Sequence, residues 1–129
     1  MFDLGVYDYV NVLDAAADAA WLRNEAIANN IANNDTPNYK RQDVAFESEL
    51  KKALKRSNGD STDEIVSNMN LSRVTPRTYT DYANYSYRMD GNNVDIEQEN
   101  VTMAENTIKY EALINSISTE FKNLQSVMK

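Results

Sequence analysis

Apolar residues recur along the first quarter of the chain at alternating steps of four and three, separated by polar residues. The repeating positions are Val6, Val10, Leu13, Ala17, Ala20, Asn24, Ile27 and Ile31. This is the heptad spacing of a helix that packs lengthwise against another helix. We therefore predict an N-terminal helix within residues 1–34, in which Asn24 is a polar seam residue that specifies register. Trp21 lies beside the seam, where it either anchors a partner helix or covers the edge of the core.

The last third of the chain carries a longer repeat of the same kind. Its positions are Met103, Thr107, Tyr110, Ile114, Ile117, Phe121, Leu124 and Met128. Asp95 precedes Gln98 at the spacing of a capping box, and the acidic Glu97 and Glu99 suit the first turn of a helix. We therefore predict a C-terminal helix within residues 94–129. A second apolar stripe consists of Val101, Ala104, Ile108 and Ala112.

Residues 35–93, between the two helices, show no sustained repeat. Three apolar residues there are spaced to pack one short element, namely Val44, Phe46 and Leu50. The alternation of residues 85–89 predicts a strand that leads into a turn. For this segment we predict a turn, a short helix and a β-hairpin within an otherwise irregular chain.

The predicted fold class is mainly α. Residues 10–34 and 96–128 would form helices about 37 Å and about 50 Å long, at about 1.5 Å per residue. We expect them to pair as an antiparallel coiled-coil-like bundle within a single domain, 1–129. Such a pair buries one stripe of each helix, so the second apolar stripe predicts contact with other copies or other proteins. A head-to-tail contact that does not close into a ring produces a helical filament.

The N-terminal helix ends in a run that is rich in asparagine. It reads Asn29-Asn30-Ile31-Ala32-Asn33-Asn34-Asp35-Thr36-Pro37-Asn38-Tyr39-Lys40. Pro37 disfavours a helical conformation at Thr36, so the helix must stop there. The asparagine amides offer paired donors and acceptors that can bond the backbone of another chain. The alternative is local, since asparagine also favours helix ends and turns for its own hydrogen bonding.

Residues 28–40, continued by Arg41-Gln42-Asp43-Val44-Ala45-Phe46, closely resemble the N-terminal signature of bacterial flagellar axial proteins, the family of rod, hook and hook-associated subunits. The pattern of that family is roughly A-N-N-I-A-N-x-x-T-P-G-Y-K. Asn38 stands where the family commonly has glycine, and asparagine tolerates a left-handed backbone better than other side chains do. A second segment resembles the proximal rod subunits in particular. It comprises Asp90-Gly91-Asn92-Asn93-Val94-Asp95-Ile96-Glu97-Gln98-Glu99, then Met103-Ala104-Glu105-Asn106 and Ile108-Lys109-Tyr110.

The resemblance implies a structural subunit of the proximal rod of the flagellar basal body, part of the axial drive shaft for motility. It implies export from the cytoplasm by the flagellar type III apparatus without a cleaved signal peptide, followed by self-assembly through the terminal helices. The implied partners are other rod subunits in a homo- and hetero-oligomeric helical assembly, a FliE-type rod-base adaptor and, indirectly, the export gate and membrane ring. The alternative is a soluble helical adaptor or signalling module that folds independently.

We expect the assembly interface to combine seam positions of both helices with the turn that follows the first. Its predicted residues are Leu13, Ala20, Ile27, Ile31, Asn33, Asn34, Asp35, Thr36, Pro37, Tyr39, Tyr110, Ile114, Ile117, Phe121 and Leu124. In terms of segments, we expect a helix at 1–34, a turn with short elements and a loop at 35–93, and a helix at 94–129.

Composition argues against several other classes of function. A net charge of -7 argues against nucleic-acid binding, and no apolar run is long enough for membrane insertion. Residues 1–6 lack the cationic and apolar regions of a cleavable secretion signal. Leu, Ile, Val and Phe form only about a fifth of the chain, so the core of an isolated subunit is expected to be small.

The chemistry of catalysis is poorly represented. The chain has no histidine and no cysteine, and its three glycines form no phosphate-binding loop. We therefore expect no enzyme, no cofactor and no metal site. Asp35, in a turn, and Asp43, on a helix edge, are interpreted as surface carboxylates and not as a catalytic pair. The basic run at 51–56 is either a solvated helix face or a site for an anionic contact.

Overall fold

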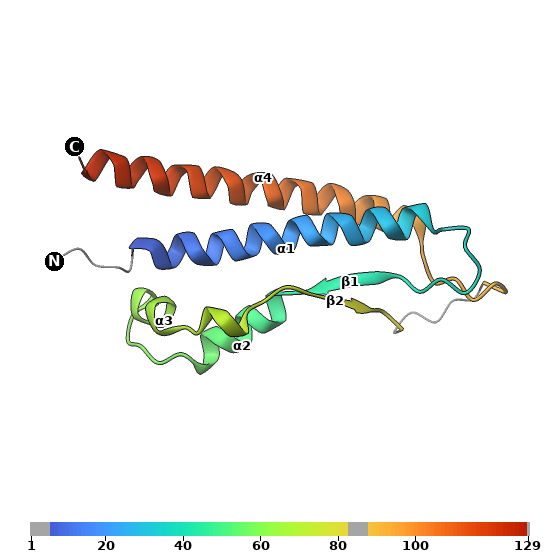
Figure 1. The fold of residues 1–129 in the computed structure, drawn as a ribbon, viewed down its shortest axis with the longest axis horizontal. Coiled ribbons are helices and arrows are strands. Elements are labelled where there is room, and N and C mark those ends of the chain that lie inside the picture. Colours follow the sequence, from blue (N-terminus) through green and yellow to red (C-terminus); the bar gives the residue numbers. More distant parts are fainter. Residues whose placement is uncertain (1–5, 83–87, 129) are drawn as a thin grey trace.

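Two long helices packed side by side form the spine of the molecule (Figure 1). The computed structural model describes residues 6–82 and 88–128, with α1 at Val6–Ala32 and α4 at Ile96–Val127. The two helices run antiparallel, and the middle of the chain lies along α1 on the side away from α4. The predicted fold class, mainly α with paired terminal helices, is confirmed. No helix within the described ranges combines the length and the apolar character that crossing a membrane requires.

Small side chains line the face of α1 that meets α4. Ala17, Ala20 and Ile27 are buried there, and the alanines allow the helix axes to approach closely. Asn24 accepts a hydrogen bond of 2.8 Å from the amide of Asn106 on α4, so the polar residue of the predicted seam does join the two helices. The side chain of Val6, the first position of that predicted seam, lies outside the described part of the molecule.

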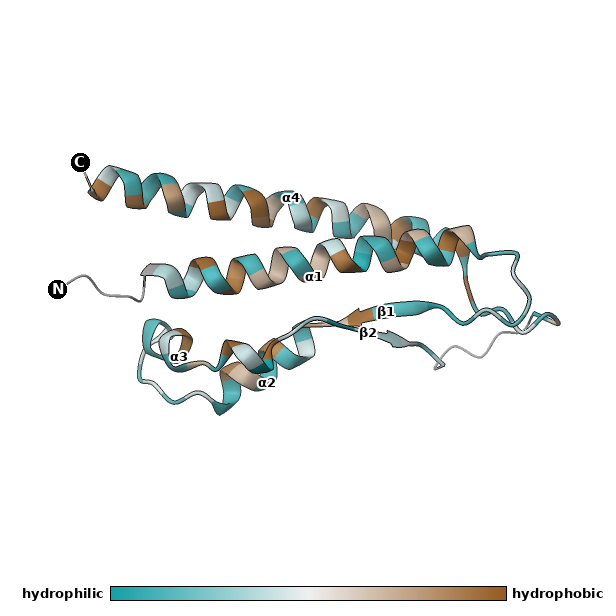
Figure 2. Cartoon of the chain, viewed as in Figure 1, coloured by the Kyte–Doolittle hydropathy of each residue, from teal (hydrophilic) through white to brown (hydrophobic). Residues whose placement is uncertain are grey.

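The predicted apolar stripe of α4 divides between two surfaces. The buried and half-buried positions, which recur at steps of four and three, include Glu99, Met103, Asn106, Tyr110, Leu113, Ile117, Glu120 and Leu124. The other half of the predicted stripe is exposed, namely Thr107, Ile114, Phe121 and Met128. The covered face of α4 is therefore partly polar, and much of the helix's apolar surface remains in solvent. Figure 2 shows that apolar residues recur along the whole of α4.

The middle segment contains a two-stranded antiparallel sheet and short helices. Strand β1 (Gln42–Ala45) pairs with β2 (Arg77–Thr80), with Gln42 opposite Thr80 and Ala45 opposite Arg77. The chain between the strands forms α2 (Glu47–Arg56), α3 (Thr62–Asn68) and the 3-10 turn η1 (Leu71–Arg73). The predicted β-hairpin of the middle segment is thus confirmed, and the chain that joins its two strands contains α2, α3 and η1. Of the strand predicted at residues 85–89, positions 85–87 lie outside the described residues.

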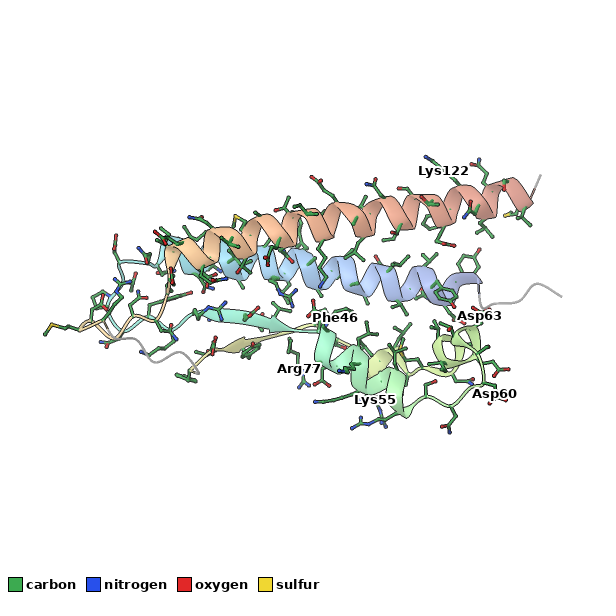
Figure 3. All side chains as sticks on the ribbon, turned by 180° about the vertical axis from the view of Figure 1, so that it is seen from behind. Phe46, Lys55, Asp60, Asp63, Arg77 and Lys122 are labelled. Carbon is green, nitrogen blue, oxygen red and sulfur yellow. The ribbon has the colours of Figure 1, made fainter. Side chains whose placement is uncertain are left out.

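The core of the middle segment rests on α1. Phe46, which lies between β1 and α2, packs with Ala19 and Val74 and is flanked by Ala15, Ala16, Leu50 and Ala53 (Figure 3). Val44 and Leu50 belong to different elements, so the prediction of one short element is corrected to a strand followed by a helix. Asp43 lies in β1, and its expected place on a helix edge is therefore wrong. The segment forms a strand because it pairs with β2, and the face of the strand that carries Val44 is buried.

The first turn of α4 is capped as the sequence predicts. The side chain of Asp95 accepts hydrogen bonds from the backbone amides of Glu97 and Gln98, at 3.1 and 3.3 Å. These bonds satisfy amides that have no partner within the helix, and Glu97 and Glu99 add negative charge near the positive end of the helix dipole. The start of α4 is therefore defined locally.

Candidate assembly surfaces

A buried amide joins the end of α1 to the segment that leads into α4. Asn92 is fully buried, and its side-chain nitrogen donates to the carbonyl oxygens of Asn33, Asn34 and Thr36 at 2.8, 3.0 and 2.8 Å. Its side-chain oxygen accepts from the backbone amide of Val94 at 2.8 Å. The last carbonyl groups of a helix have no partner within the helix. Asn92, although distant in sequence, supplies the hydrogen-bond donor that a local capping residue would otherwise supply.

A second buried side-chain amide, that of Asn30, lies on α1 about one turn before Asn33 and Asn34. The side-chain oxygen of Asn30 accepts from the Gln42 backbone amide at 2.8 Å and from the Tyr39 hydroxyl at 3.1 Å. Its nitrogen donates to the Gln42 carbonyl at 2.8 Å and to the Glu99 carboxylate at 3.1 Å. Burial raises the pKa of Tyr39, and the negative charge of Glu99 raises it further, so the hydroxyl remains a donor.

An arginine matches the buried carboxylate at the same junction. Arg41 donates from Nε to Glu99 at 2.7 Å and from a terminal nitrogen to Asp81 at 2.6 Å, and its backbone amide donates to Asn93 at 2.6 Å. Burial alone would lower the pKa of Arg41, but the hydrogen bonds to Glu99 and Asp81 raise it above its ordinary value. A buried carboxylate is tolerable only when it is paired in this way. The junction of α1, β1 and α4 is therefore a satisfied polar cluster.

The turn after α1 takes the conformation that its proline and asparagine favour. Asn38 has a positive φ of 62°, which confirms that asparagine occupies the left-handed position where the axial-protein pattern has glycine. Its backbone amide donates to the carbonyl oxygen of Asp90 at 2.7 Å. Gly91 also has a positive φ, of 76°, and a Cβ added there would lie 2.6 Å from the side-chain oxygen of Asn38. The two turns therefore fit together only with glycine at position 91.

The predicted turn residues contribute to this junction in different ways. Asn33, Asn34 and Thr36 offer their backbone carbonyls to Asn92, while Tyr39 binds Asn30. The side chains of Asp35 and Pro37 are exposed. Among the asparagines of the run, the fully buried Asn30 bonds this chain's own backbone, in line with the intrachain alternative and not with a bond to another chain.

The predicted helix positions fall into two groups. Those that face the α1–α4 interface are buried or half-buried, namely Leu13, Ala20, Ile27, Ile31, Tyr110, Ile117 and Leu124. Two others, Ile114 and Phe121, are 39% and 50% exposed. Sequence reasoning did not single out Asn30, Asn92 or the pairing of Arg41 with Glu99. The local signal for Glu99 was present, since a carboxylate stands four residues before Met103 in the heptad spacing.

Exposed apolar side chains lie on more than one side of α4, where the single chain does not cover them. They are Ile96, Val101, Ile108, Ile114, Phe121, Val127 and Met128. On α1, Trp21 is 57% exposed while its ring lies 6.0 Å from that of Tyr110, so it both covers the helix interface and faces solvent. A groove of about 330 Å³ beside it is lined by Trp21, Ala28, Met103 and Thr107 with Asn24 and Glu25. Exposed apolar surface on this scale is typical of a protein-binding face.

The geometry offers little for catalysis. Within residues 6–82 and 88–128, no group of three or more acidic, histidine or cysteine side chains is arranged to hold a metal ion. The polar clusters that are present, around Asn30, Asn92 and Glu99, are buried and occupied by partners from the chain itself. The outward-facing side chains are apolar or charged, and such surfaces suit protein contacts.

Comparison with known proteins places these surfaces in a family context. Residues 12–40, which span most of α1 and the turn after it, match the family model described as flagella basal body rod protein. The flagellar basal body rod protein FlgB of Bacillus subtilis is 36% identical over 118 residues, which cover 90% of this chain and 89% of that protein. The FlgB of Borreliella burgdorferi is 37% identical over 121 residues, covering 87% and 89%. The FlgB of Escherichia coli is 34% identical over 119 residues, covering 83% of each.

Proposed function

This chain belongs to the FlgB family of flagellar basal body rod proteins, and on that premise we propose that it polymerises through its terminal helices as part of the proximal rod. It is a structural subunit of the rod, located in the flagellar basal body. The family membership favours the rod over an independently folded adaptor or signalling module. The proposed role is non-enzymatic, and the packed helices would transmit mechanical load along the rod.

The observation that carries the proposal is the exposed apolar surface of α4. Ile108, Ile114 and Phe121 are 68%, 39% and 50% exposed on a helix that already packs against α1 with another face. Leaving such side chains in water is unfavourable by about 25 cal/mol for each Å² of apolar area. Contact with other subunits removes this cost, and a contact that repeats head to tail builds a rod.

The narrow core supports export before final assembly. The α1–α4 interface contains alanines and polar residues such as Asn106 and Glu99, and most of its large apolar side chains, such as Ile117, are only half-buried. Such an interface is opened at modest cost, which suits passage through the flagellar type III channel followed by folding at the growing end. By this proposal the partners are other rod subunits, a FliE-type adaptor at the rod base and, through it, the membrane ring and export gate.

Substitution of exposed apolar positions on α4 tests the proposal. We expect the double variant Ile114→Asp and Phe121→Asp to fold as the parent chain does, because both side chains are exposed, but to be absent from rods. Ser116→Asp, at an exposed polar position of the same helix, is the matched control and should be incorporated normally. The measurement is recovery of tagged chain in purified basal bodies from a bacterium that lacks its own copy of the subunit.

Hydrogen exchange separates assembly from folding. In the parent chain we expect amide protection along α4 to rise on incorporation, with the largest change between residues 107 and 128. Normal incorporation of the double variant, or unchanged protection of α4 in assembled rods, would contradict polymerisation through this helix.

A further inference from the structure

The middle segment concentrates positive charge on an otherwise acidic chain. Lys51, Lys52, Lys55, Arg56, Arg73 and Arg77, here called the basic surface, are all exposed. They are six of the thirteen Lys and Arg residues in a chain of net charge -7. Within the described ranges, Lys52 alone of the six forms an ion pair, with Glu49 at 3.0 Å. The basic surface is therefore largely uncompensated.

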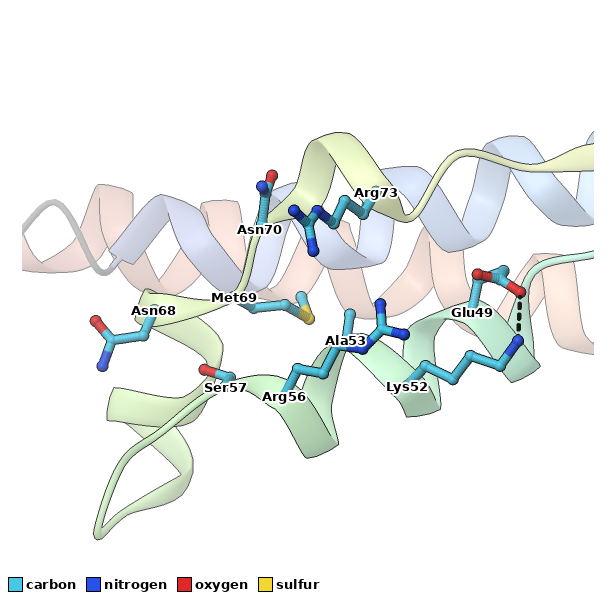
Figure 4. A pocket seen from close by; sticks show the side chains of 9 residues that line it. All are labelled: Glu49, Lys52, Ala53, Arg56, Ser57, Asn68, Met69, Asn70 and Arg73. Carbon is cyan, nitrogen blue, oxygen red and sulfur yellow. Dashed lines mark hydrogen bonds and ion pairs between the residues drawn. The ribbon is translucent and has the colours of Figure 1, made fainter.

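The basic surface has a shaped centre between α2 and η1. A pocket of about 280 Å³ is lined by Lys52, Arg56 and Arg73 together with Glu49 and polar residues of the α3–η1 connection (Figure 4). Lys55 and Arg77 extend from the side of the molecule away from α4 (Figure 3). Converging cations with one carboxylate among them form a surface that attracts an acidic partner.

α1 carries the complementary charge on its free face. The exposed positions of this helix keep the four-three spacing and include Asp14, Asp18, Trp21 and Glu25. The three carboxylates, here called the acidic stripe, form no hydrogen bond or ion pair within the described part of the chain. The stripe runs past the groove beside Trp21, so it combines negative charge with an apolar edge.

The two charged surfaces cannot meet within one molecule. The middle segment packs on the face of α1 that carries Ala15 and Ala19, and α4 packs on the face that carries Ala20 and Asn24. At 100° per residue, Asp18 points away from both of these faces. The basic surface lies on the outer side of the middle segment. Each surface is therefore open to another molecule.

We propose that the basic surface of one copy docks on the acidic stripe of α1 in a second copy. This inference rests on the proposed polymerisation and names a contact for it outside the apolar face of α4. The two surfaces differ, so the contact is heterologous and extends into an open array when its rotation does not close. Opposite charges also speed encounter and fix the register of association.

The acidic stripe is favoured over the other acidic group of the chain. Asp60, Asp63 and Glu64 lie around the start of α3, but Asp63 accepts the Tyr9 hydroxyl at 2.5 Å and Glu64 binds the Asp60 amide at 2.8 Å. These two carboxylates already hold the α3 region in place. Asp14, Asp18 and Glu25 have no such internal role.

A charge swap tests the contact. We expect Lys51→Glu with Lys55→Glu, and separately Asp14→Lys with Asp18→Lys, to weaken self-association of the purified chain about tenfold at low salt. The chain that carries all four substitutions restores the opposite charges and should recover most of the parent affinity. Lys122→Glu, at an exposed position of α4 that projects away from both surfaces, is the control (Figure 3). Sedimentation equilibrium measures association, and circular dichroism confirms that each variant is helical.

Cross-linking locates the contact directly, because the chain has no cysteine of its own. Chains with Lys55→Cys should form a disulfide with chains that carry Asp18→Cys, and far less with chains that carry Lys122→Cys or Asp60→Cys. Failure of the four-substitution chain to recover, a parent chain that stays monomeric at low salt, or preferential linkage through Asp60→Cys would each overturn the inference. Normal rod incorporation of the charge-reversed variants, with the α4 double variant still excluded, would overturn it while leaving the proposed function intact.

Discussion

The side-chain amide of Asn30 donates to the carboxylate of Glu99 at 3.1 Å, although the two residues are 69 positions apart in the chain. Both are buried, and Glu99 also accepts from Arg41 at 2.7 Å. This contact ties the last turns of α1 to the first turn of α4. The two motifs by which the sequence resembles rod proteins therefore meet in one place.

Glu99→Gln should destabilise the chain by about 3 kcal/mol, because it leaves the positive charge of the half-buried Arg41 guanidinium only partly balanced. Chemical unfolding followed by circular dichroism measures the free energy of unfolding. Glu97→Gln is the matched control, since Glu97 lies two residues earlier and is exposed. Equal stability of the two variants would contradict the role given to the buried pair.

Asn92→Asp should cost about 2 to 4 kcal/mol, because a carboxylate cannot donate to the carbonyl oxygens of Asn33, Asn34 and Thr36. Faster amide exchange in the turn at 33–39 should accompany the loss. Asn100→Asp makes the same chemical change at an exposed site on α4 and should leave exchange in that turn unchanged. A slow, parent-like turn in the Asn92 variant would show that the end of α1 does not depend on this amide.

The elements that the sequence predicted are those whose signals are local. The heptad steps of α1 and α4, the Asp95 cap and the left-handed Asn38 each depend on residues within a few positions of one another. Asn92, by contrast, is recognisable as a cap only when the chain has folded back through 56 or more positions. The residues next to Asn92 in the sequence contain no signal that identifies the carbonyl groups to which it donates.

The face of α4 was harder to predict for a related reason. The heptad spacing selected Thr107, Ile114 and Phe121 as part of the seam, whereas the chain covers Glu99 and Asn106. Both polar residues bond side chains of α1, and Glu99 also accepts from Arg41, just before β1. β1 was hard to predict for a similar reason, since it forms by pairing with β2, which lies beyond α2 and α3 in the chain.

Glu47 should give the chain an acid-sensitive component of stability. A hydrogen bond from Arg23 lowers the pKa of Glu47 to about 2, and Lys109 on α4 also binds this carboxylate. Because the folded pKa is depressed, the contribution is fully present above the ordinary glutamate pKa of 4.5 and is lost as the pH falls towards about 2. Glu47 is about half exposed, so solvent screening limits the contribution to about 1 kcal/mol.

Glu47→Gln should therefore flatten the profile of unfolding free energy against pH between about pH 4.5 and pH 2. Urea unfolding at a series of pH values measures that profile. Glu111→Gln, at an exposed position of α4, is the control and should keep the slope of the parent chain. A parent-like slope in the Glu47 variant would mean that the contacts to Arg23 and Lys109 add no stability.

Ile117→Asp should prevent assembly by a different route from that of Ile114→Asp. Ile117 is half-buried on the side of α4 that faces α1, so a charge there weakens the helix pair itself, by about 2 to 3 kcal/mol. Ile114 is 39% exposed, and its replacement should change the stability of the free chain by about 0.5 kcal/mol or less. Thermal unfolding of the purified chains separates the two effects before any rod is examined. If Ile117→Asp melts with the parent chain and still enters rods, the helix pair of the free chain does not persist in the assembly, and the covered face of α4 would have to be assigned anew.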